Sequence, residues 1–293
     1  MSSNAIEIRG LQKTYPGFQL GPLDLTVPCG AIYGFIGPNG AGKSTTMDLI
    51  FSMGRRDAGT ITVNGLDNLS DEVEFKRQVG YVSPDISFAI WGRVGKVIRF
   101  VRGFYPTWDD DYADRLLKEF RLNPADRLAT LSFGARTKLS LLLALAHRPK
   151  VLILDEPTTG LDAVSRRQIF AELLQTVKDG DRTVFISSHG LADLERFADH
   201  VGLIKDGRLL FEGQTDEIVE RFRQVDLEAP ADIQITSSHG CTVIGRDGNR
   251  WRALVDKTRD GLERIQAVGA KVIASTPVSL EELFVALMRE EQG

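Results

Sequence analysis

Apolar residues in the first part of the chain alternate with polar ones or form short blocks, as they do in β-strands. Residues 6–8 and 23–27 alternate, and residues 31–36 form an apolar run with β-branched and aromatic members. Residues 60–63 end at the turn pair Asn64–Gly65, which predicts a further strand with a tight exit. We therefore expect the N-terminal region to consist largely of strands.

Helical spacing replaces this pattern between residues 108 and 148. Three aspartates at 109–111 place negative charge where the N-terminus of a helix favours it. Leu116 and Phe120 follow on one face of the same predicted helix. We assign residues of about 85–150 to a helical subdomain.

Two continuous apolar runs, 151–154 and 183–186, have the composition of strands covered on both faces of a sheet. Between them an amphipathic helix is predicted over 164–178, ending at Gly180. Strand, helix and strand in this order indicate a parallel crossover, so the core is predicted to be α/β.

The pattern changes again after residue 225, where residues 228–232 are predicted to form a linker. The remaining elements are expected to be strands at 233–235, 251–255 and 271–274, a helix over 260–268, and a last helix opened by the capping-box pair Ser279 and Glu282. We therefore divide the chain into a domain over 1–225 and a small α+β domain over 226–293.

Composition narrows the possible functions. The 293 residues carry a net charge of −4, which does not fit a strongly basic nucleic-acid-binding surface. The two cysteines, Cys29 and Cys241, have neither disulfide-framework nor zinc-site spacing. The polar N-terminus does not resemble a signal peptide. The apolar stretch at 139–146 is shorter than the roughly 20 residues that a membrane-spanning helix needs, so we expect no such segment.

A glycine-rich segment directly after the strand at 31–36 fits the phosphate-loop pattern. In this pattern, backbone N–H groups and a helix N-terminus surround an anion. We expect Lys43 to reach the β- and γ-phosphates of a nucleotide and the Ser44 hydroxyl to bind Mg²⁺. The predicted nucleotide-binding residues of this loop are Gly37, Asn39, Gly40, Ala41, Gly42, Lys43, Ser44 and Thr45.

Two carboxylates follow the apolar run at 151–154, at the strand end where parallel sheets bind ligands. We expect Asp155 to hold Mg²⁺ and Glu156 to act as the general base that activates the attacking water. By itself, an Asp–Glu pair at this position is also typical of a surface turn after a buried strand. The phosphate loop earlier in the chain favours the catalytic interpretation.

Three further motifs complete a recognisable set, in the order Leu131-Ser132-Phe133-Gly134-Ala135, Pro157-Thr158-Thr159-Gly160-Leu161-Asp162 and Ser187-Ser188-His189. With the phosphate loop, this set resembles the nucleotide-binding subunit of ATP-binding-cassette (ABC) transporters over residues 1 to about 220, with a closer similarity to bacterial multidrug and bacitracin exporters. The resemblance implies a P-loop ATPase core with a mixed sheet, an antiparallel β subdomain and a helical subdomain.

The resemblance also implies roles for individual residues. Tyr15 is expected to stack on adenine; the alternative interpretation is an ordinary tyrosine at a strand end. Ser132 and Gly134 are expected to bind the γ-phosphate of a nucleotide held by a second subunit. Asp162 is placed at the interface between the two subunits. His189 is expected to contact the γ-phosphate and to keep water and the base in register.

The chain departs from the family pattern in two places. Phe133 and Ala135 replace a glycine and a glutamine of the usual signature. The glutamine expected after the strand at 79–82 is missing, with Pro84 or Asp85 in its place. Only Asp85 has a side-chain oxygen that could bind Mg²⁺, so we expect it either to replace the glutamine or to be an ordinary loop residue.

Residues 83–104 are rich in large apolar side chains: Ile86, Phe88, Ile90, Trp91, Ile98 and Phe104. In the family, this segment receives a helix of the membrane subunit. The alternative is that these side chains form the core of the helical subdomain. Exposed apolar patches indicate partner contacts, and buried ones do not, so the two interpretations differ in exposure.

The sequence thus predicts a cytoplasmic ATPase, peripheral on the inner face of the membrane, that uses ATP and Mg²⁺. Two such subunits, identical or different, would close head to tail around two nucleotides and drive export through a separate transmembrane permease. Two alternatives stay open: a regulatory ATP switch, because of Phe133, Ala135 and the missing glutamine, and a soluble machine acting on DNA or ribosomes. No nucleic-acid partner is expected in the favoured interpretation.

Overall fold

The structure is a computed structural model that describes residues 4–84, 90, 92–178, 180–188, 191–230 and 233–289. The chain divides into two compact units. The first comprises Met1–His189 and Phe197–Glu212, and the second comprises Gly190–Arg196 and Gly213–Gly293. The division predicted at 225/226 falls within a strand of the second unit, β11 (Phe222–Glu228), so in the structure the units separate closer to residue 213.

The first unit is built on a six-stranded sheet with the strand order β10-β9-β3-β8-β7-β6. Strands β9, β3, β8, β7 and β6 pair in parallel, as the crossover pattern predicted. Its central strands are continuously buried because helices and a second sheet cover them. The strands are β3 (Ile32–Ile36), β6 (Val79–Val82), β7 (Val151–Leu154), β8 (Thr183–Ser187), β9 (His200–Lys205) and β10 (Arg208–Gln214).

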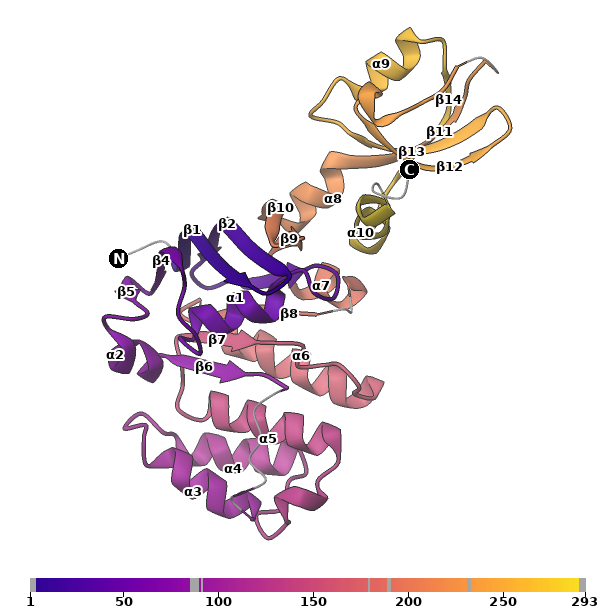
Figure 1. Cartoon of the computed structure of the whole chain (residues 1–293). Helices are drawn as coiled ribbons and strands as arrows, with labels where there is room; N and C mark the ends of the chain where they lie inside the picture. Colours follow the sequence, from indigo (N-terminus) through magenta and orange to yellow (C-terminus); the bar gives the residue numbers. More distant parts are fainter. Residues whose placement is uncertain are drawn as a thin grey trace. The chain divides into compact units, whose positions relative to one another are not determined.

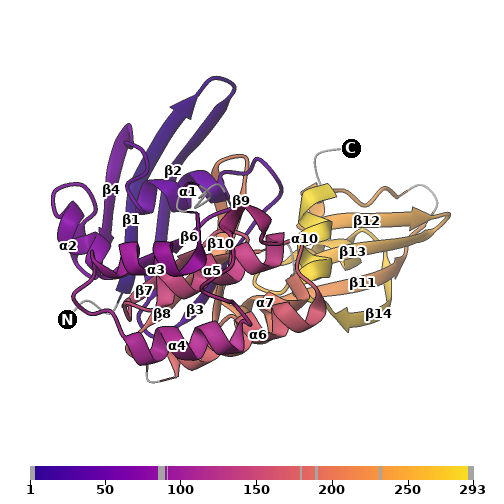
Figure 2. The ribbon, with the colours of Figure 1, turned by 90° about the horizontal axis from the view of Figure 1, so that it is seen from below.

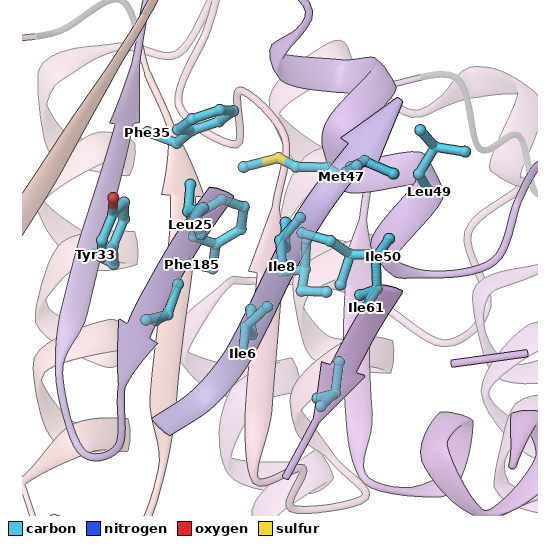
Figure 3. Close-up of a cluster of buried hydrophobic side chains, with 14 of the residues drawn as sticks. Ile6, Ile8, Leu25, Tyr33, Phe35, Met47, Leu49, Ile50, Ile61 and Phe185 are labelled. Atoms are coloured by element: carbon cyan, nitrogen blue, oxygen red, sulfur yellow. The ribbon is translucent and has the colours of Figure 1, made fainter. Parts of the chain in front are cut away.

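A four-stranded sheet, ordered β2-β1-β4-β5, packs against the six-stranded one. Its strands are β1 (Asn4–Tyr15), β2 (Phe18–Pro28), β4 (Ala58–Val63) and β5 (Leu66–Asp67), with antiparallel pairing throughout. Figure 3 shows Ile6 and Ile8 of this sheet in one cluster with Met47 of α1 and with Phe35 and Phe185 of the larger sheet. This shared core fixes α1 relative to both sheets.

The helices of the first unit are α1 (Lys43–Ile50), α2 (Glu72–Arg77), α3 (Val94–Arg102), α4 (Asp110–Glu119), α5 (Phe133–Leu145) and α6 (Ala163–Val177). Figure 1 shows α3, α4 and α5 grouped on one side of the six-stranded sheet, with the sheet of β1 and β2 on the other. The predicted helix start at 109–111 is confirmed, because the Asp109 carboxylate accepts a hydrogen bond from Tyr112 N at 2.8 Å. These three helices form the helical part of the unit.

A buried glutamate ties α4 to α6. The Glu172 carboxylate of α6 is 2% exposed and accepts hydrogen bonds from Tyr112 Oη at 2.6 Å and from the Arg115 guanidinium at 2.8 Å. Figure 2 shows α4 beside α6. A buried carboxylate is stable only when charged or polar partners compensate for its lost hydration, and Tyr112 and Arg115 provide them here.

The second unit contains a separate four-stranded sheet with the order β12-β13-β11-β14 and antiparallel pairing. Its own apolar core includes Val225, Leu227, Trp251 and Ile265. Its remaining elements are β12 (Cys241–Asp247), β13 (Arg250–Asp256), β14 (Lys271–Pro277), α7 (Leu191–Phe197, of which 191–196 belong here), α8 (Thr215–Arg221), α9 (Gly261–Ala267) and α10 (Leu280–Arg289).

The α+β composition of this unit agrees with the prediction, but its strands differ in part, and β12 lies in a stretch for which no strand was predicted. The strand predicted at 233–235 is wrong: this stretch is irregular, and Ile235 is buried in the core without joining the sheet. The strand before it, β11, begins ahead of the predicted linker. The capping box is confirmed, because Ser279 N donates to Glu282 Oε2 at 2.8 Å and Glu282 N donates to Ser279 Oγ at 3.2 Å.

Candidate nucleotide site

The loop between β3 and α1 requires glycine at specific positions. Gly42, at the start of α1, has φ of 106°, a left-handed conformation that side chains disfavour. At Gly37, a Cβ atom would lie 2.3 Å from the Ile204 carbonyl oxygen of β9, so only glycine fits between the strands. Because Gly42 has no side chain, the N-terminus of α1 has no side-chain cap of its own.

Lys43 is the first residue of α1, and its side chain is directed back along the loop. The residue is only 6% exposed, and Nζ donates to the Gly37 and Pro38 carbonyl oxygens at 2.7 and 3.1 Å. Burial lowers the pKa of the Lys43 ammonium, and the nearby carboxylates of Glu156 and Asp155 act against that shift. The loop thus holds a partly desolvated cation inside a ring of backbone, where it acts strongly on an anionic ligand.

The two carboxylates predicted to act together lie directly after β7. Asp155 is 3% exposed, and its Oδ1 accepts a hydrogen bond from Ser187 Oγ at 2.7 Å. Glu156 is only partly exposed, and its Oε1 lies 3.9 Å from Lys43 Nζ. Its other oxygen accepts a hydrogen bond from Thr159 Oγ1 at 2.9 Å. The structure therefore brings the lysine of the phosphate loop and the predicted base to one place.

A pocket of about 460 Å³ opens over this group. It is lined by Gly17, Phe18, Asn39, Gly40, Gly42, Lys43, Ser44, Thr45 and Glu156. The aromatic side chain among these described lining residues is Phe18, at the start of β2.

Tyr15, the predicted adenine contact, lies at the end of β1 with 43% of its surface exposed and with Lys13 Nζ 5.5 Å from its ring centre. Phe18 was not predicted from the sequence, in which Tyr15 was the aromatic residue expected to contact the nucleotide.

The residue types at the pocket suit a magnesium ion held jointly with a nucleotide. The Ser44 hydroxyl and the Asp155 carboxylate are hard oxygen donors of the kind that Mg²⁺ prefers. The described part of the chain contains no group of three or more His, Cys, Asp or Glu residues that could hold a metal without further ligands.

The signature residues form a second, separate group at the N-terminus of α5. Ser132 is the N-cap residue of α5, and its Oγ accepts a hydrogen bond from Ala135 N at 3.2 Å. Phe133 is 52% exposed, and its ring lies against Gly160, where an added Cβ would meet it at 3.3 Å. Gly134 is similarly close to Leu161. The predicted signature therefore contacts the loop that follows Glu156 in the same chain.

Asp162, at the end of that loop, is exposed and caps α6. Its carboxylate accepts hydrogen bonds from Ser165 N at 2.9 Å and from Ser165 Oγ at 2.8 Å. These bonds hold the pKa of Asp162 below its ordinary value, the backbone bond contributing most. Among the residues described as lining the phosphate-loop pocket, neither Ser132 nor Asp162 occurs. Within one chain, these two residues thus form a surface apart from that pocket.

Two predicted site residues, Asp85 and His189, lie outside the described residues.

The described part of the segment after β6 carries exposed apolar side chains: Ile90 is 87% exposed, Phe100 43% and Phe104 62%. Within the described residues, no helix is both long and apolar enough to cross a bilayer. Val94 and Val97 of the same segment are buried, so part of it forms core and part of it is surface.

The chain is similar to ATP-binding proteins from bacteria. Residues 20–159 match the family model described as "ABC transporter". The chain is 30% identical to the ABC transporter ATP-binding protein YtrB of Bacillus subtilis, over 96% of this chain and 97% of that protein. It is 32% identical to the daunorubicin/doxorubicin resistance ATP-binding protein DrrA of Streptomyces peucetius, over 97% of this chain and 92% of that protein.

A solved structure of an ATP-binding subunit of an ABC transporter resembles the fold, with a TM-score of 0.65 and 26% identity. The similarity covers 74% of this chain and 92% of that one. The part of the chain that carries the phosphate loop and both carboxylates is thus the part with a family match.

Proposed function

This chain belongs to the ATP-binding subunits of ABC transporters, as its motifs predicted, and from that premise we propose how its residues bind and hydrolyse ATP. It is an ATPase, and its hydrolysis of ATP serves transport. The observation that carries the assignment of residues is the approach of Lys43 Nζ to Glu156 Oε1, 3.9 Å apart in one pocket although 113 positions separate them in the sequence.

In the proposed mechanism, the phosphate loop holds the triphosphate with its backbone N–H groups and Lys43 neutralises charge that develops on the γ-phosphoryl group. Glu156 orients a water molecule in line with the γ-phosphorus and accepts its proton. The water oxygen bonds to phosphorus while the bond to the β–γ bridging oxygen breaks, which gives ADP and phosphate. Lys43 and Glu156 lie close enough together to act on one phosphoryl group.

We assign Mg²⁺ to Ser44 and Asp155, whose oxygens suit it. When bound, the ion supplies charge neutralisation for the β- and γ-phosphates. The chain's own contribution is to fix these two oxygen donors. Asp155 is buried, with its carboxylate held by Ser187, so one orientation of the donor is favoured before any ligand arrives.

We further propose that two copies, or one copy and a related subunit, close around two ATP molecules. Ser132 and Gly134 of one subunit would then contact the γ-phosphate bound by the other, with Asp162 at the interface and His189 and Asp85 at the site. Support comes from the exposure of Ser132, Phe133 and Asp162, which lie on a surface apart from the chain's own phosphate-loop pocket. A helix N-terminus such as that of α5 attracts a phosphate.

The proposed partner is a separate membrane permease with export activity, and the proposed location is the cytoplasmic face of the membrane. Ile90, Phe100 and Phe104 are large apolar side chains exposed within the segment 83–104. Exposed apolar side chains that gather in one segment are typical of a protein contact. We place the permease contact there, and we assign ATPase activity to the first unit.

The decisive test is light scattering on Glu156→Gln with and without Mg·ATP. This variant should bind ATP without turning it over, so we expect a shift from monomer to dimer only with Mg·ATP. Glu156→Gln combined with Lys43→Ala is the control, and it should remain monomeric. Dimers that form equally without nucleotide would contradict ATP-driven closure. Wild-type protein that binds ATP but shows no turnover, alone or with membranes, would favour the regulatory ATP switch.

A further inference from the structure

The hydroxyl of one buried serine connects both carboxylate-bearing residues of the site. Ser187 is the last residue of β8 and has no exposed surface. Its Oγ donates to Asp155 Oδ1 at 2.7 Å and accepts a hydrogen bond from the Glu156 backbone N–H at 2.8 Å. It thus joins β8 to the end of the neighbouring parallel strand, β7, where the catalytic chemistry is placed.

The direction of each hydrogen bond is determined by the groups involved. A serine hydroxyl has one hydrogen to donate, and a backbone N–H can only donate. Because the Glu156 N–H occupies a lone pair of Ser187 Oγ, the hydroxyl hydrogen is available for the Asp155 carboxylate. One oxygen of Asp155 is thereby engaged, which restricts the orientation of the carboxylate.

The second bond acts on the backbone of Glu156. Glu156 has φ of 48°, in the left-handed region that residues other than glycine seldom adopt. In this conformation its carboxylate lies beside Lys43 and accepts a hydrogen bond from Thr159. Strained backbone of this kind persists when surrounding bonds hold it in place, and the bond from Glu156 N to Ser187 is one of them.

We propose that Ser187 is a positioning residue for ATP hydrolysis. Its hydroxyl orients the Asp155 carboxylate and stabilises the left-handed backbone conformation of Glu156. The proposal rests on the proposed function of Asp155 and Glu156. Ser187 touches neither nucleotide nor water in this mechanism and acts through its two neighbours. Its removal should therefore change the chemical step and the use of Mg²⁺ more than the binding of nucleotide itself.

Four variants at this position isolate the hydroxyl. Ser187→Ala removes it without adding atoms. Ser187→Thr and Ser187→Val add the same bulk to the buried site, and only the first retains a hydroxyl, so their ratio reports the hydroxyl at constant shape. Ser187→Cys keeps the size of the side chain with a weaker donor, and it serves if the alanine variant does not fold.

The same strand offers a matched control at its other end. Thr183 is 2% exposed, and its Oγ1 accepts a hydrogen bond from Gly30 N at 2.9 Å. Thr183→Val therefore removes a buried hydroxyl that also accepts a backbone N–H, far from the carboxylates along β8. Both Thr183→Val and Ser187→Ala should lower the melting temperature, but only the latter should change catalysis.

The first readout is steady-state ATPase kinetics. Partners that orient metal-binding carboxylates typically contribute about 10- to 100-fold to metal affinity or activity. We expect kcat of Ser187→Ala to fall by about 10- to 100-fold with KM for ATP changed less than about threefold, and Ser187→Thr to exceed Ser187→Val by at least about fivefold.

The second readout needs no turnover. In the Glu156→Gln background, ATP binding is measured by calorimetry at a series of Mg²⁺ concentrations and in EDTA. With Ser187→Ala added, the Mg²⁺ concentration for half-maximal binding should rise by about 10-fold, while binding in EDTA stays within about twofold.

Two outcomes would overturn the proposal. One is a kcat and Mg²⁺ dependence of Ser187→Ala that match those of Thr183→Val, which would make Ser187 a purely structural residue. The other is equal kcat for the threonine and valine variants. Failure of the proposed function would be recognised separately, because Glu156→Gln alone would then retain full turnover.

Discussion

The two groups of predicted nucleotide contacts in this chain are built in opposite ways. Lys43 and Asp155 are buried and Glu156 is partly so. Lys43 Nζ donates to loop carbonyl oxygens after β3, and the Asp155 carboxylate accepts a hydrogen bond from Ser187 of β8. Ser132 and Asp162 are exposed. The Ser132 hydroxyl accepts a hydrogen bond that caps α5, and the Asp162 carboxylate accepts one that caps α6. The first group is assembled within one chain, whereas the second is presented on its surface.

This difference indicates which part of the site a single subunit can organise. Buried donors and acceptors are oriented before the ligand arrives, and such preorganisation is a main source of catalytic power. A capping side chain at a helix N-terminus already contributes to stability in the isolated subunit, because it stabilises the helix by about 1 kcal/mol. In the proposed mechanism, the exposed group therefore takes part in catalysis only when a second subunit brings a phosphate to it.

The largest effect is expected for the base of the buried group. Glu156→Gln retains shape and hydrogen bonding but cannot accept a proton, so kcat should fall by about 10²- to 10⁴-fold. Nucleotide affinity, measured by calorimetry, should change little. Glu74→Gln, on an exposed face of α2, is the control and should retain full turnover. A Glu156→Gln variant with more than about a tenth of wild-type kcat would contradict the role of general base.

A second effect on the buried group is expected in binding. Lys43→Ala removes a partly desolvated cation, and hydrogen bonds to charged groups contribute about 1.5–3 kcal/mol. ATP should therefore bind roughly 10- to 100-fold more weakly in calorimetry. The partly exposed Lys76, paired with Glu72 on α2, offers the control Lys76→Ala. Equal ATP affinity in wild type and Lys43→Ala would remove Lys43 from the phosphate site.

The buried group was the more predictable from sequence, and the reason is physical. A phosphate loop needs glycine where backbone passes close to backbone, as Gly37 does beside Ile204, so its geometry leaves a fixed pattern of residue types. The continuous apolar runs at 151–154 and 183–186 likewise correspond to buried strands. The fold class and the family resemblance followed from these local signals and are confirmed.

What the sequence did not reveal depends on contacts between distant segments. Ser187 looked like the polar end of a strand, and only the pairing of β7 with β8 places its hydroxyl on Asp155. Phe18 lines the pocket because a hairpin returns it to the loop at Gly42. The prediction of a strand at 233–235 was wrong for a similar reason. Ile235 is an apolar residue buried in the core of the second unit, and a residue can be buried in this core without belonging to the sheet.

A smaller effect is expected in the exposed group, where capping and nucleotide contact must be separated. Ser132→Ala should weaken α5 by about 1 kcal/mol and remove one proposed contact to the partner's nucleotide. Ser279 is a matched control, because its Oγ also accepts an N–H three residues ahead at 3.2 Å, at the start of α10. Both alanine variants should lose similar stability in urea denaturation.

Only Ser132→Ala should alter assembly. In the Glu156→Gln background it should need about 10-fold more protein to dimerise with Mg·ATP, which corresponds to about 1.4 kcal/mol. Ser279→Ala in the same background should dimerise as the parent does. If both variants dimerise equally well, Ser132 acts only as a helix cap. It would then not belong to the exposed group that contacts the nucleotide of the second subunit.

The smallest effect concerns Asp162 and is expected in acid. Hydrogen bonds from Ser165, that from its backbone N–H first, hold the pKa of Asp162 below its ordinary value, which is about 3.9 in an unfolded chain. The stabilisation by the carboxylate is thus complete above about pH 4 and is lost as pH falls through the lower pKa of the folded state. Asp162→Asn still caps α6 but does not titrate.

Urea denaturation of wild type and Asp162→Asn should therefore give a stability difference that is constant from pH 7 to about 5 and shifts in favour of the variant below about pH 4. Asp109→Asn, at the cap of α4, should behave similarly in acid, because hydrogen bonds also lower the pKa of Asp109. The two positions should differ in assembly: Asp162→Asn should weaken ATP-driven dimerisation in the Glu156→Gln background, and Asp109→Asn should not. A stability difference independent of pH would contradict the role of the Asp162 carboxylate as the cap of α6. Equal dimerisation of the two variants would contradict a place for Asp162 at the interface between subunits. The two roles of this exposed carboxylate are therefore tested independently.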